Sequence, residues 1–332
     1  MVDSIIACEV AAVMKENKPG LHALGNGAWA WLAKDGTWGY SNAGLITDGD
    51  AALLVDTLFD LNLTDTMLRA MRNADPAAHN INTLVNTHAN GDHCHGNVRL
   101  GDIDIIASKA SAEEMTELPP EALAALMASA KEMGPVGQYL LHCFGDFSFD
   151  GIHLSMPNRT FEGELEVAVG DKTVQLIEVG PAHTRGDILA YCPNDKVVYT
   201  GDILFIEGTP IMWEGPVANW IDACKRIEAM DVSAIVPGHG PICDAKAVAA
   251  VREYLEYVRD QARLRYDAGM NVLEAAKDIE LTHYSDWSEP ERIVVNVDSL
   301  YREFDQSRQR SDIFTLFDQM AELAGFKTSD QP

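Results

Sequence analysis

Metal-binding side chains crowd together directly after a short apolar run. Residues 81–85 are mostly apolar, and they are followed at once by His88, Asn90, Asp92 and His93. Side chains repeat every two residues in extended backbone, so His88 and Asn90 face the same way, and the glycine between Asn90 and Asp92 allows a turn that presents the remaining pair. Imidazole and carboxylate groups are ligands for zinc and similar divalent ions. The pattern therefore predicts a metal site at the end of a strand.

Three further candidate ligands lie in glycine-rich turns later in the chain. His183, Asp202 and His239 each follow a segment with the composition of a short strand, at 173–179, 196–199 and 234–236. A single histidine is more often a packed or surface residue than a ligand. In this chain a predicted strand is followed by a candidate ligand four times. Binding sites of α/β proteins lie beyond the carboxyl ends of strands. We therefore expect all seven side chains to converge.

Four motifs together resemble the metallo-β-lactamase superfamily, in which His-x-His-x-Asp-His is followed by a His, an Asp and another His. The matching segments are His88-Ala89-Asn90-Gly91-Asp92-His93, Gly180-Pro181-Ala182-His183-Thr184-Arg185-Gly186-Asp187, Tyr199-Thr200-Gly201-Asp202 and Val236-Pro237-Gly238-His239-Gly240. The resemblance covers roughly residues 20–245 and implies an α/β fold, a four-layer αββα sandwich with the metals at one edge. Asn90 departs from it, because it stands where the superfamily has its second histidine.

The resemblance also implies a division of ligands. His88, Asn90 and His183 would form a first site, Asp92, His93 and His239 a second site, and Asp202 would bridge them. Zinc suits this mixture best, with iron and manganese as alternatives. An amide oxygen is a weaker donor to zinc than an imidazole nitrogen, so we expect one tight and one loose zinc, or a single metal.

Residues beside these motifs have a functional and a structural interpretation. His95 is either a substitute ligand for the first site, a hydrogen-bonding partner of a ligand, or a surface residue. Arg185 either binds a substrate carboxylate or forms a salt bridge within its own loop. Trp213 and Trp220 follow the bridging aspartate closely and either line a substrate pocket or fill the core. Asp56, beneath the site by the resemblance, is expected to be structural.

The elements that would position the site alternate between strands and helices. Strands are predicted at 28–32, 41–46, 51–55, 103–107, 165–169 and 187–191, with hairpin turns at Asp35-Gly36, Asp48-Gly49 and Gly170-Asp171. A helix is predicted at 64–72, another begins at a capping box at Ser111, and a third spans 121–133. Residues 108–150 form a helical insertion, which is either a packed helical pair or a hydrophobic lid over the site.

Residues 246–332 are predicted to be a helical extension of the catalytic domain at 20–245. Apolar residues recur at helical spacing in three stripes, and a capping box at Ser288 precedes the second. These stripes are expected to cover a sheet or a dimer partner, so we expect a homo-oligomer.

Charge and cysteine usage limit the choice of partners. The chain has 25 basic and 51 acidic residues, a formal charge of −26, which disfavours nucleic acid and anionic membranes as partners. Six cysteines form no Cys-x-x-Cys pair, and the first thirty residues lack the pattern of an export signal. No apolar run is long enough to span a bilayer. We expect a cytoplasmic protein with reduced thiols.

These features predict a zinc-dependent hydrolase of a small, apolar or aromatic molecule. A metal-bound hydroxide would attack an ester, thioester or lactone bond, with Asp92 positioning it as the catalytic carboxylate. One alternative is an iron-dependent oxidoreductase of the same superfamily, of the persulfide dioxygenase type. The other is a non-catalytic binding protein, which Asn90 alone suggests.

Overall fold

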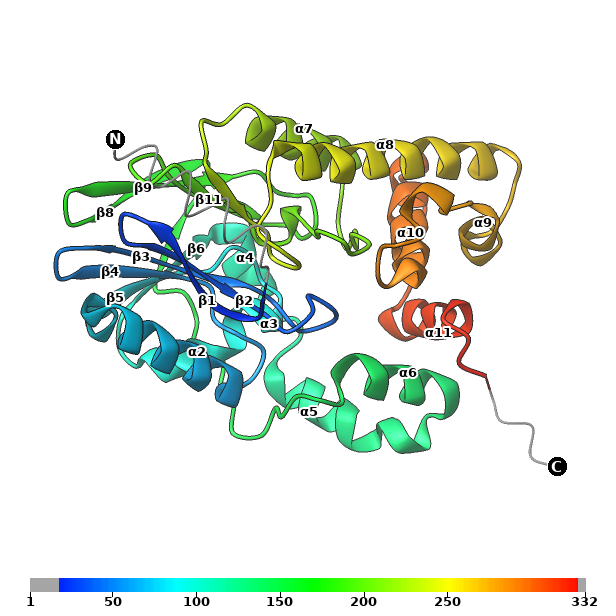
Figure 1. The fold of residues 1–332 in the computed structure, drawn as a ribbon. Coiled ribbons are helices and arrows are strands. Elements are labelled where there is room, and N and C mark those ends of the chain that lie inside the picture. Colours follow the sequence, from blue (N-terminus) through cyan, green and yellow to red (C-terminus); the bar gives the residue numbers. More distant parts are fainter. Residues whose placement is uncertain (1–17, 328–332) are drawn as a thin grey trace.

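The computed structural model describes residues 18–327, which form two β-sheets flanked by helices (Figure 1). The first sheet has its strands in sequence order: β1 (Gly20–Gly25), β2 (Ala28–Leu32), β3 (Ala43–Asp48), β4 (Ala51–Val55), β5 (Ile81–Val85), β6 (Asp104–Ser108) and β7 (Arg159–Phe161). β1 to β4 pair antiparallel, whereas β4 to β7 pair parallel. Parallel pairing needs long crossovers, and these carry the helices and the first ligand motif.

The second sheet runs in the order β12, β11, β10, β9, β8. Its strands are β8 (Glu164–Val169), β9 (Lys172–Glu178), β10 (Ile188–Cys192), β11 (Val197–Tyr199) and β12 (Ala234–Val236). Only β11 and β12 pair parallel, and the crossover between them contains α7 (Val217–Glu228). β8 and β9 form the predicted hairpin, with Gly170 in the left-handed region that its turn requires.

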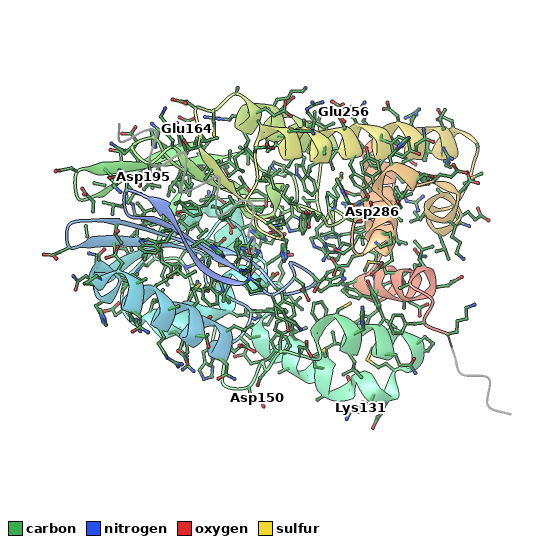
Figure 2. All side chains as sticks on the ribbon, viewed as in Figure 1. Lys131, Asp150, Glu164, Asp195, Glu256 and Asp286 are labelled. Atoms are coloured by element: carbon green, nitrogen blue, oxygen red, sulfur yellow. The ribbon has the colours of Figure 1, made fainter. Side chains whose placement is uncertain are left out.

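Apolar side chains of both sheets pack face to face to form the central core. Val55 and Ile106 of the first sheet belong to the same buried cluster as Leu176 and Val236 of the second. On the outer face of the first sheet, α2 (Leu61–Ala74) buries Met67, Leu68 and Met71 against Leu45 and Leu54. The outer face of the second sheet is covered by α7 and α8 (Ala245–Asp267). This arrangement confirms the predicted αββα sandwich, and Figure 2 shows side chains filling the space between its layers.

Two predicted helix starts were wrong. The helix expected to begin at Ser111 is α4 (Lys109–Glu114), and its N-cap is Ser108, whose hydroxyl accepts the Ser111 N–H over 3.1 Å. The capping box expected at Ser288 is absent, since α10 (Ile293–Phe304) follows a short helical turn and Glu289 adopts a left-handed conformation with φ of 58°. In the first place the serine three residues earlier supplies the cap, and in the second no side-chain hydrogen bond caps α10.

The predicted hairpin turn at Asp35-Gly36 was also wrong. β2 and β3 do pair antiparallel, but the loop between them extends from Ala33 to Asn42. The backbone of Gly36 lies against Gly240, with no room for a Cβ atom: such an atom would lie 2.5 Å from the Gly240 nitrogen. The loop therefore reaches across to the turn that carries His239.

The insertion and the C-terminal helices pack on each other at one end of the sandwich (Figure 1). The insertion contains α5 (Pro120–Ser129) and α6 (Gly134–Phe144), and the C-terminal region adds α9 (Val272–Asp278) and α11 (Ile313–Leu323) to α8 and α10. Phe144 of α6 lies 6.1 Å from Phe317 of α11, measured between ring centroids. α11, the last helix of the described residues, thus packs directly on the insertion.

The cysteines of the described residues are all buried thiols: Cys94, Cys143, Cys192, Cys224 and Cys243. Cys8 lies outside the described residues, as do the last five residues of the C-terminal region. Among the helices at 18–327, none combines the length and the apolar composition needed to cross a bilayer.

Candidate metal centre

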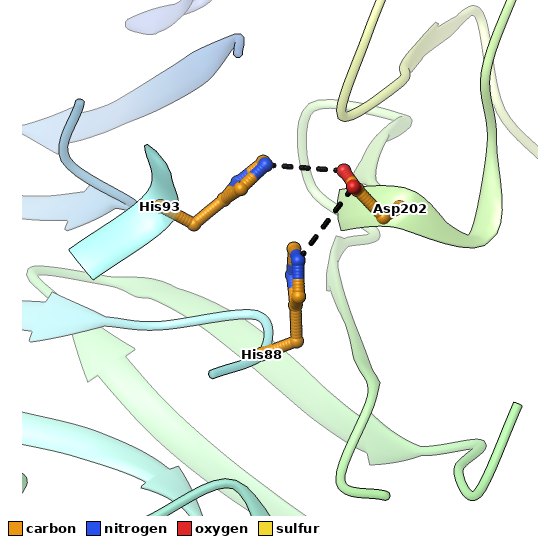
Figure 3. A group of neighbouring side chains, drawn as sticks. All are labelled: His88, His93 and Asp202. Carbon is orange, nitrogen blue, oxygen red and sulfur yellow. Dashed lines mark ion pairs between the residues drawn. The ribbon is translucent and has the colours of Figure 1, made fainter. Parts of the chain in front are cut away.

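Four strand ends deliver the predicted ligands to one edge of the sandwich. His88 follows β5, His183 follows β9, Asp202 follows β11 and His239 follows β12. The side chains of His88, His93 and Asp202 point toward one another from different segments (Figure 3). All four histidines and Asp202 are buried, with at most 3% of each residue exposed.

Imidazole nitrogens surround the carboxylate of Asp202. The distances from its oxygens to Nε2 are 3.1 Å for His93, 3.3 Å for His183, 3.4 Å for His239 and 3.7 Å for His88. A second carboxylate joins from Asp92, whose Oδ2 lies 3.3 Å from Nε2 of His239 and 3.9 Å from Nε2 of His93. Two groups thus have their ligand atoms close enough for a shared metal ion: His88, His93 and Asp202, and Asp92, His93 and His239.

The chemistry of these atoms fits metal ions. Nε2 of His88, Nε2 of His93 and Oδ1 of Asp202 are buried and make no hydrogen bond, although Nε2 of His93 and Oδ1 of Asp202 form an ion pair over 3.1 Å. Two tetrahedral ligands at about 2.0–2.1 Å from zinc lie about 3.4 Å apart, close to the separations around Asp202. Buried polar atoms without partners are costly, and metal coordination would satisfy them.

Acceptors behind the histidines set the direction of their lone pairs. Nδ1 of His183 donates to the carbonyl of Ile211 over 2.7 Å, and Nδ1 of His239 donates to the carbonyl of Gly36 over 3.1 Å. When a neutral imidazole donates a hydrogen bond from Nδ1, its free lone pair is on Nε2. In both of these histidines Nε2 faces the centre. The loop after β2 thus serves to orient His239.

Asp56 has the same function for His93. Its Oδ2 lies 2.9 Å from Nδ1 of His93, and its two oxygens also accept the Thr87 hydroxyl and N–H over 2.7 Å each. Asp56 is buried and has a φ of 62°, a conformation that non-glycine residues seldom adopt. Sequence reasoning assigned Asp56 a structural role and missed this contact, although its position directly after strand 51–55 was a usable signal.

Asn90 contacts a neighbouring histidine. Its amide nitrogen lies 3.0 Å from Nε2 of His183. Because Nδ1 of His183 donates to Ile211, Nε2 accepts a hydrogen bond from the Asn90 amide. In this arrangement the two groups satisfy each other, so the Nε2 lone pair of His183 is engaged within the chain.

Charges in the centre are strongly coupled. Burial lowers the pKa of His93 and His239, but Asp202 and the neighbouring carboxylates outweigh it: the pKa of His93 is raised well above its usual value and that of His239 to about 9. Burial, followed by the charge of His93, lowers the pKa of His88. Burial alone would raise the pKa of Asp92, but His93 and His239 bring it down to about 2. The carboxylates of Asp202 and Asp92 therefore favour the protonated forms of His93 and His239.

His95 is buried, so its interpretation as a surface residue was wrong. Its ring stacks on Phe59 with centroids 5.5 Å apart and lies against Gly91, where a Cβ atom would be 2.4 Å from Cε1 of His95. Nδ1 of His95 has no hydrogen-bond partner. Its role toward the ligands stays a prediction.

The predicted substrate-binding residues lie around His183. Arg185 pairs with Glu114 and Glu117 of the 109–117 segment, at 3.5 and 2.5 Å, instead of within its own loop. Trp220 is fully buried and donates its indole N–H to the Ile203 carbonyl, with its ring 5.9 Å from that of His183. The backbone N–H of Trp213 donates to the His183 carbonyl over 3.1 Å.

Two curated relatives are similar to a part of this chain. A segment of 87 residues is 33% identical to the 2,4-dinitroanisole O-demethylase subunit alpha of a Nocardioides species, covering 24% of this chain and 25% of the relative. Another of 83 residues is 36% identical to a hydroxyacylglutathione hydrolase of Brucella ovis, covering 25% of this chain and 32% of the relative. The matches thus span about a quarter to a third of the length of these relatives.

Solved structures share the fold over a larger part of the chain. An inverting sec-alkylsulfatase from a Pseudomonas species aligns with a TM-score of 0.64 at 17% identity, over 90% of this chain and 52% of the other. A metallo-beta-lactamase from Pontibacter korlensis aligns with a TM-score of 0.51 at 17% identity, over 71% of this chain and 98% of the other. The sequence profile of the metallo-beta-lactamase superfamily matches residues 36–239, which include every predicted ligand. The chain belongs to the metallo-beta-lactamase superfamily.

Proposed function

We propose that this chain is a zinc-dependent hydrolase that cleaves an ester, thioester or lactone bond of a small apolar or aromatic molecule. The observation that carries the proposal is the convergence of four histidines and two aspartates, whose buried nitrogen and oxygen atoms contact one another and in part make no hydrogen bond. This donor set suits a divalent metal, and the superfamily is largely hydrolytic.

The residues of the centre would hold the metal in two unequal parts. Asp92, His93 and His239 form a set with one carboxylate and two imidazoles, and Asp202 lies within reach of both parts. The other part is weaker in this proposal, because Asn90 replaces an imidazole and donates a hydrogen bond to His183. A divalent metal held here supplies Lewis acidity and lowers the pKa of water from about 16 toward about 7.

Asp92 is proposed as the catalytic carboxylate. Its side chain is 13% exposed, compared with 3% for Asp202, so it borders the solvent side of the centre. Because its pKa is lowered to about 2, it is ionised at neutral pH and can accept a hydrogen bond from an attacking water. His93 and His239 keep the carboxylate in place through contacts of 3.9 and 3.3 Å.

Of the similar proteins, the hydroxyacylglutathione hydrolase is a hydrolase by its name, and the names differ in substrate. One acts by its name on hydroxyacylglutathione, another on 2,4-dinitroanisole and a third on secondary alkyl sulfates. The proposal of an apolar or aromatic substrate rests instead on the buried aromatic side chains of the insertion and the C-terminal helices.

Elemental analysis of the chain purified without added metal is the first test, followed by a screen of esters, thioesters and lactones. One or two zincs per chain with turnover of at least one class supports the proposal. Iron in place of zinc would support an oxidoreductase of the same superfamily. If the chain binds no metal even after zinc is added, a non-catalytic binding protein would be the remaining interpretation.

A further inference from the structure

Residues 209–214 pass beside His183 without forming a helix or a strand, and we call them the supporting segment. Thr209, Ile211 and Met212 of this segment are each at most 2% exposed. Buried N–H and C=O groups need hydrogen-bond partners, and a segment without regular structure must obtain them from side chains or from other loops. The polar groups around the supporting segment therefore decide its conformation.

The supporting segment bonds both the ring and the backbone of His183. The carbonyl of Ile211 accepts Nδ1–H of the ring over 2.7 Å. The backbone N–H groups of Trp213 and Glu214 donate to the His183 carbonyl over 3.1 and 3.2 Å. The orientation of the ring, and that of the turn that carries it, thus depend on the supporting segment.

The supporting segment is held in turn by α10 and the residue that precedes this helix. Four side chains donate hydrogen bonds to carbonyls of the segment, at distances of 2.9 to 3.1 Å: Arg292 to Thr209, Asn296 to Pro210, Ser299 to Glu214 and Arg302 to Trp213. Successive donors are three or four residues apart, and such positions share one face of a helix. One face of α10 therefore fixes the segment that orients His183.

Asn296 bonds the same peptide group that bonds the ring of His183. Its Oδ1 accepts the Met212 N–H over 2.7 Å, and this N–H belongs to the peptide group that carries the Ile211 carbonyl. A peptide group is planar, and in the trans form its N–H and C=O point in opposite directions. Asn296 and His183 therefore lie at opposite ends of one rigid unit, which forms a relay between them.

The surroundings of Asn296 determine which way its amide points. The residue is 1% exposed, and its amide nitrogen donates to the carbonyl of Pro210 over 2.9 Å and to the hydroxyl of Tyr254 over 3.1 Å. The N–H of Met212 can only donate and the carbonyl of Pro210 can only accept, so the amide has a single orientation that satisfies both. Asn296 thus offers its oxygen to the relay in one fixed direction.

We propose that Asn296 is a positioning residue of the metal centre, which fixes the ring of His183 through the peptide group between Ile211 and Met212. The relay keeps the ring proton on Nδ1, so the lone pair lies on Nε2, the atom that is 3.3 Å from Asp202. This inference rests on the proposed function for the metal that His183 would bind. It gives the C-terminal region a part in metal binding, in addition to covering the sheet.

NMR spectroscopy of the zinc-loaded chain with ¹⁵N-labelled histidine tests the relay. In the parent chain the Nδ1–H groups of His183 and His239 each donate to a carbonyl, and we expect a signal protected from exchange for each. Asn296→Leu has a similar volume and no polar side-chain atom, so it should shift or remove the His183 signal and leave the His239 signal unchanged. Loss of both signals, or of neither, would overturn the inference. Asn296→Ser gives the same comparison if Asn296→Leu does not fold.

Zinc affinity, measured by competition with a chromophoric chelator, tests the consequence for the metal. We expect Asn296→Leu to bind zinc about ten-fold more weakly than the parent chain. Ser299→Ala is the matched control, because it removes one bond between the same helix face and the supporting segment but leaves the peptide group after Ile211 untouched. It should bind zinc like the parent chain, and an equal loss in both variants would overturn the inference.

Asn296→Asp is the conservative variant, because it keeps an oxygen for the Met212 N–H. Its zinc affinity and its His183 signal should lie closer to those of the parent chain than the values of Asn296→Leu do. If Asn296→Asp and Asn296→Leu are equally impaired, the bond to Met212 is not the cause.

The inference and the proposed function can fail separately. If the parent chain binds no zinc, the proposed function fails, and the His183 signal of the metal-free parent and of Asn296→Leu still tests the relay. If the parent chain binds zinc and hydrolyses an ester while Asn296→Leu keeps the His183 signal and the zinc affinity, only the inference about Asn296 fails.

Discussion

Asp56 and His93 are joined by a hydrogen bond of 2.9 Å between Oδ2 and Nδ1, on the side of the ring that faces away from the other ligands. The carboxylate fixes the tautomer of His93 and directs Nε2 toward Asp202. His93 belongs to both groups that could hold a metal, so this single contact supports the whole centre.

Asp56→Asn is expected to weaken metal binding by about 10- to 100-fold, the usual effect of losing a carboxylate behind a ligating histidine. Competition with a chromophoric chelator measures the affinity. Asp195→Asn is the control, because Asp195 is equally buried and pairs with Lys172 away from the centre. That variant should lose stability but keep its metal affinity, and the prediction fails if the two variants lose affinity alike.

Asn90→His is expected to raise the zinc content per chain or to tighten the weaker zinc. The substitution replaces an amide that donates to His183 with a second imidazole donor for the metal. Titration with zinc, followed by elemental analysis, gives the stoichiometry. No change in either quantity would contradict the hypothesis that Asn90 weakens the first site.

Metal affinity should rise steeply with pH. Burial lowers the pKa of His239, yet Asp202 and Asp92 raise it to about 9 overall, and Asp202, Asp56 and Asp92 likewise raise the pKa of His93, so both rings favour their protonated forms. Zinc binds the neutral rings and must displace these protons, so the apparent affinity should increase by about 10- to 100-fold per pH unit between pH 6 and 8. Calorimetry in buffers of different ionisation enthalpy would count the protons released. Binding without proton release would contradict the charge balance described for the centre.

Replacing His95 by Phe should make the fold less sensitive to acid. Burial lowers the pKa of His95 to about 4, whereas an unfolded histidine titrates near 6.5. A lowered pKa in the folded state contributes stability that is present above about pH 6.5 and is lost as the pH falls toward 4. The parent chain should therefore lose about 2 kcal/mol of stability from this group when the pH falls from 7.5 to 5.0. His95→Phe lacks the group, so its free energy of unfolding should rise by that amount relative to the parent chain over the same change of pH.

Urea unfolding at both pH values, with zinc present, measures this difference. His153→Phe is the control, because the His153 side chain is 81% exposed. If His95→Phe changes the free energy of unfolding by the same amount at both pH values, the protonation of His95 plays no part in stability.

Repeated local patterns explain why much of the centre could be predicted. His88, His183, Asp202 and His239 each follow a strand recognisable from its own apolar residues, and the fold needs only to bring those strand ends together. The strands at 28–32, 51–55 and 81–85 have the predicted bounds, because alternation and turn residues delimit them locally. The superfamily and its sandwich followed from the same motifs.

Contacts between distant segments could not be predicted in the same way. The Asp35-Gly36 turn resembled a hairpin, but its loop is held by Gly240, more than two hundred residues later. Nothing local in the sequence distinguishes Trp38 or Phe317 from an ordinary core residue, since their contact depends on how α11 packs against α6. The hydrogen bond between Asn90 and His183 likewise exists only after two loops have met.

The position of Phe317 in the last helix has a consequence for how the protein is made. Domains fold from the amino terminus during synthesis, and every predicted metal ligand has been translated once the ribosome passes residue 239. Phe144 of the insertion lacks its contact with Phe317 until α11 has been translated, so the predicted ligands can come together before the helices at this end of the sandwich finish packing.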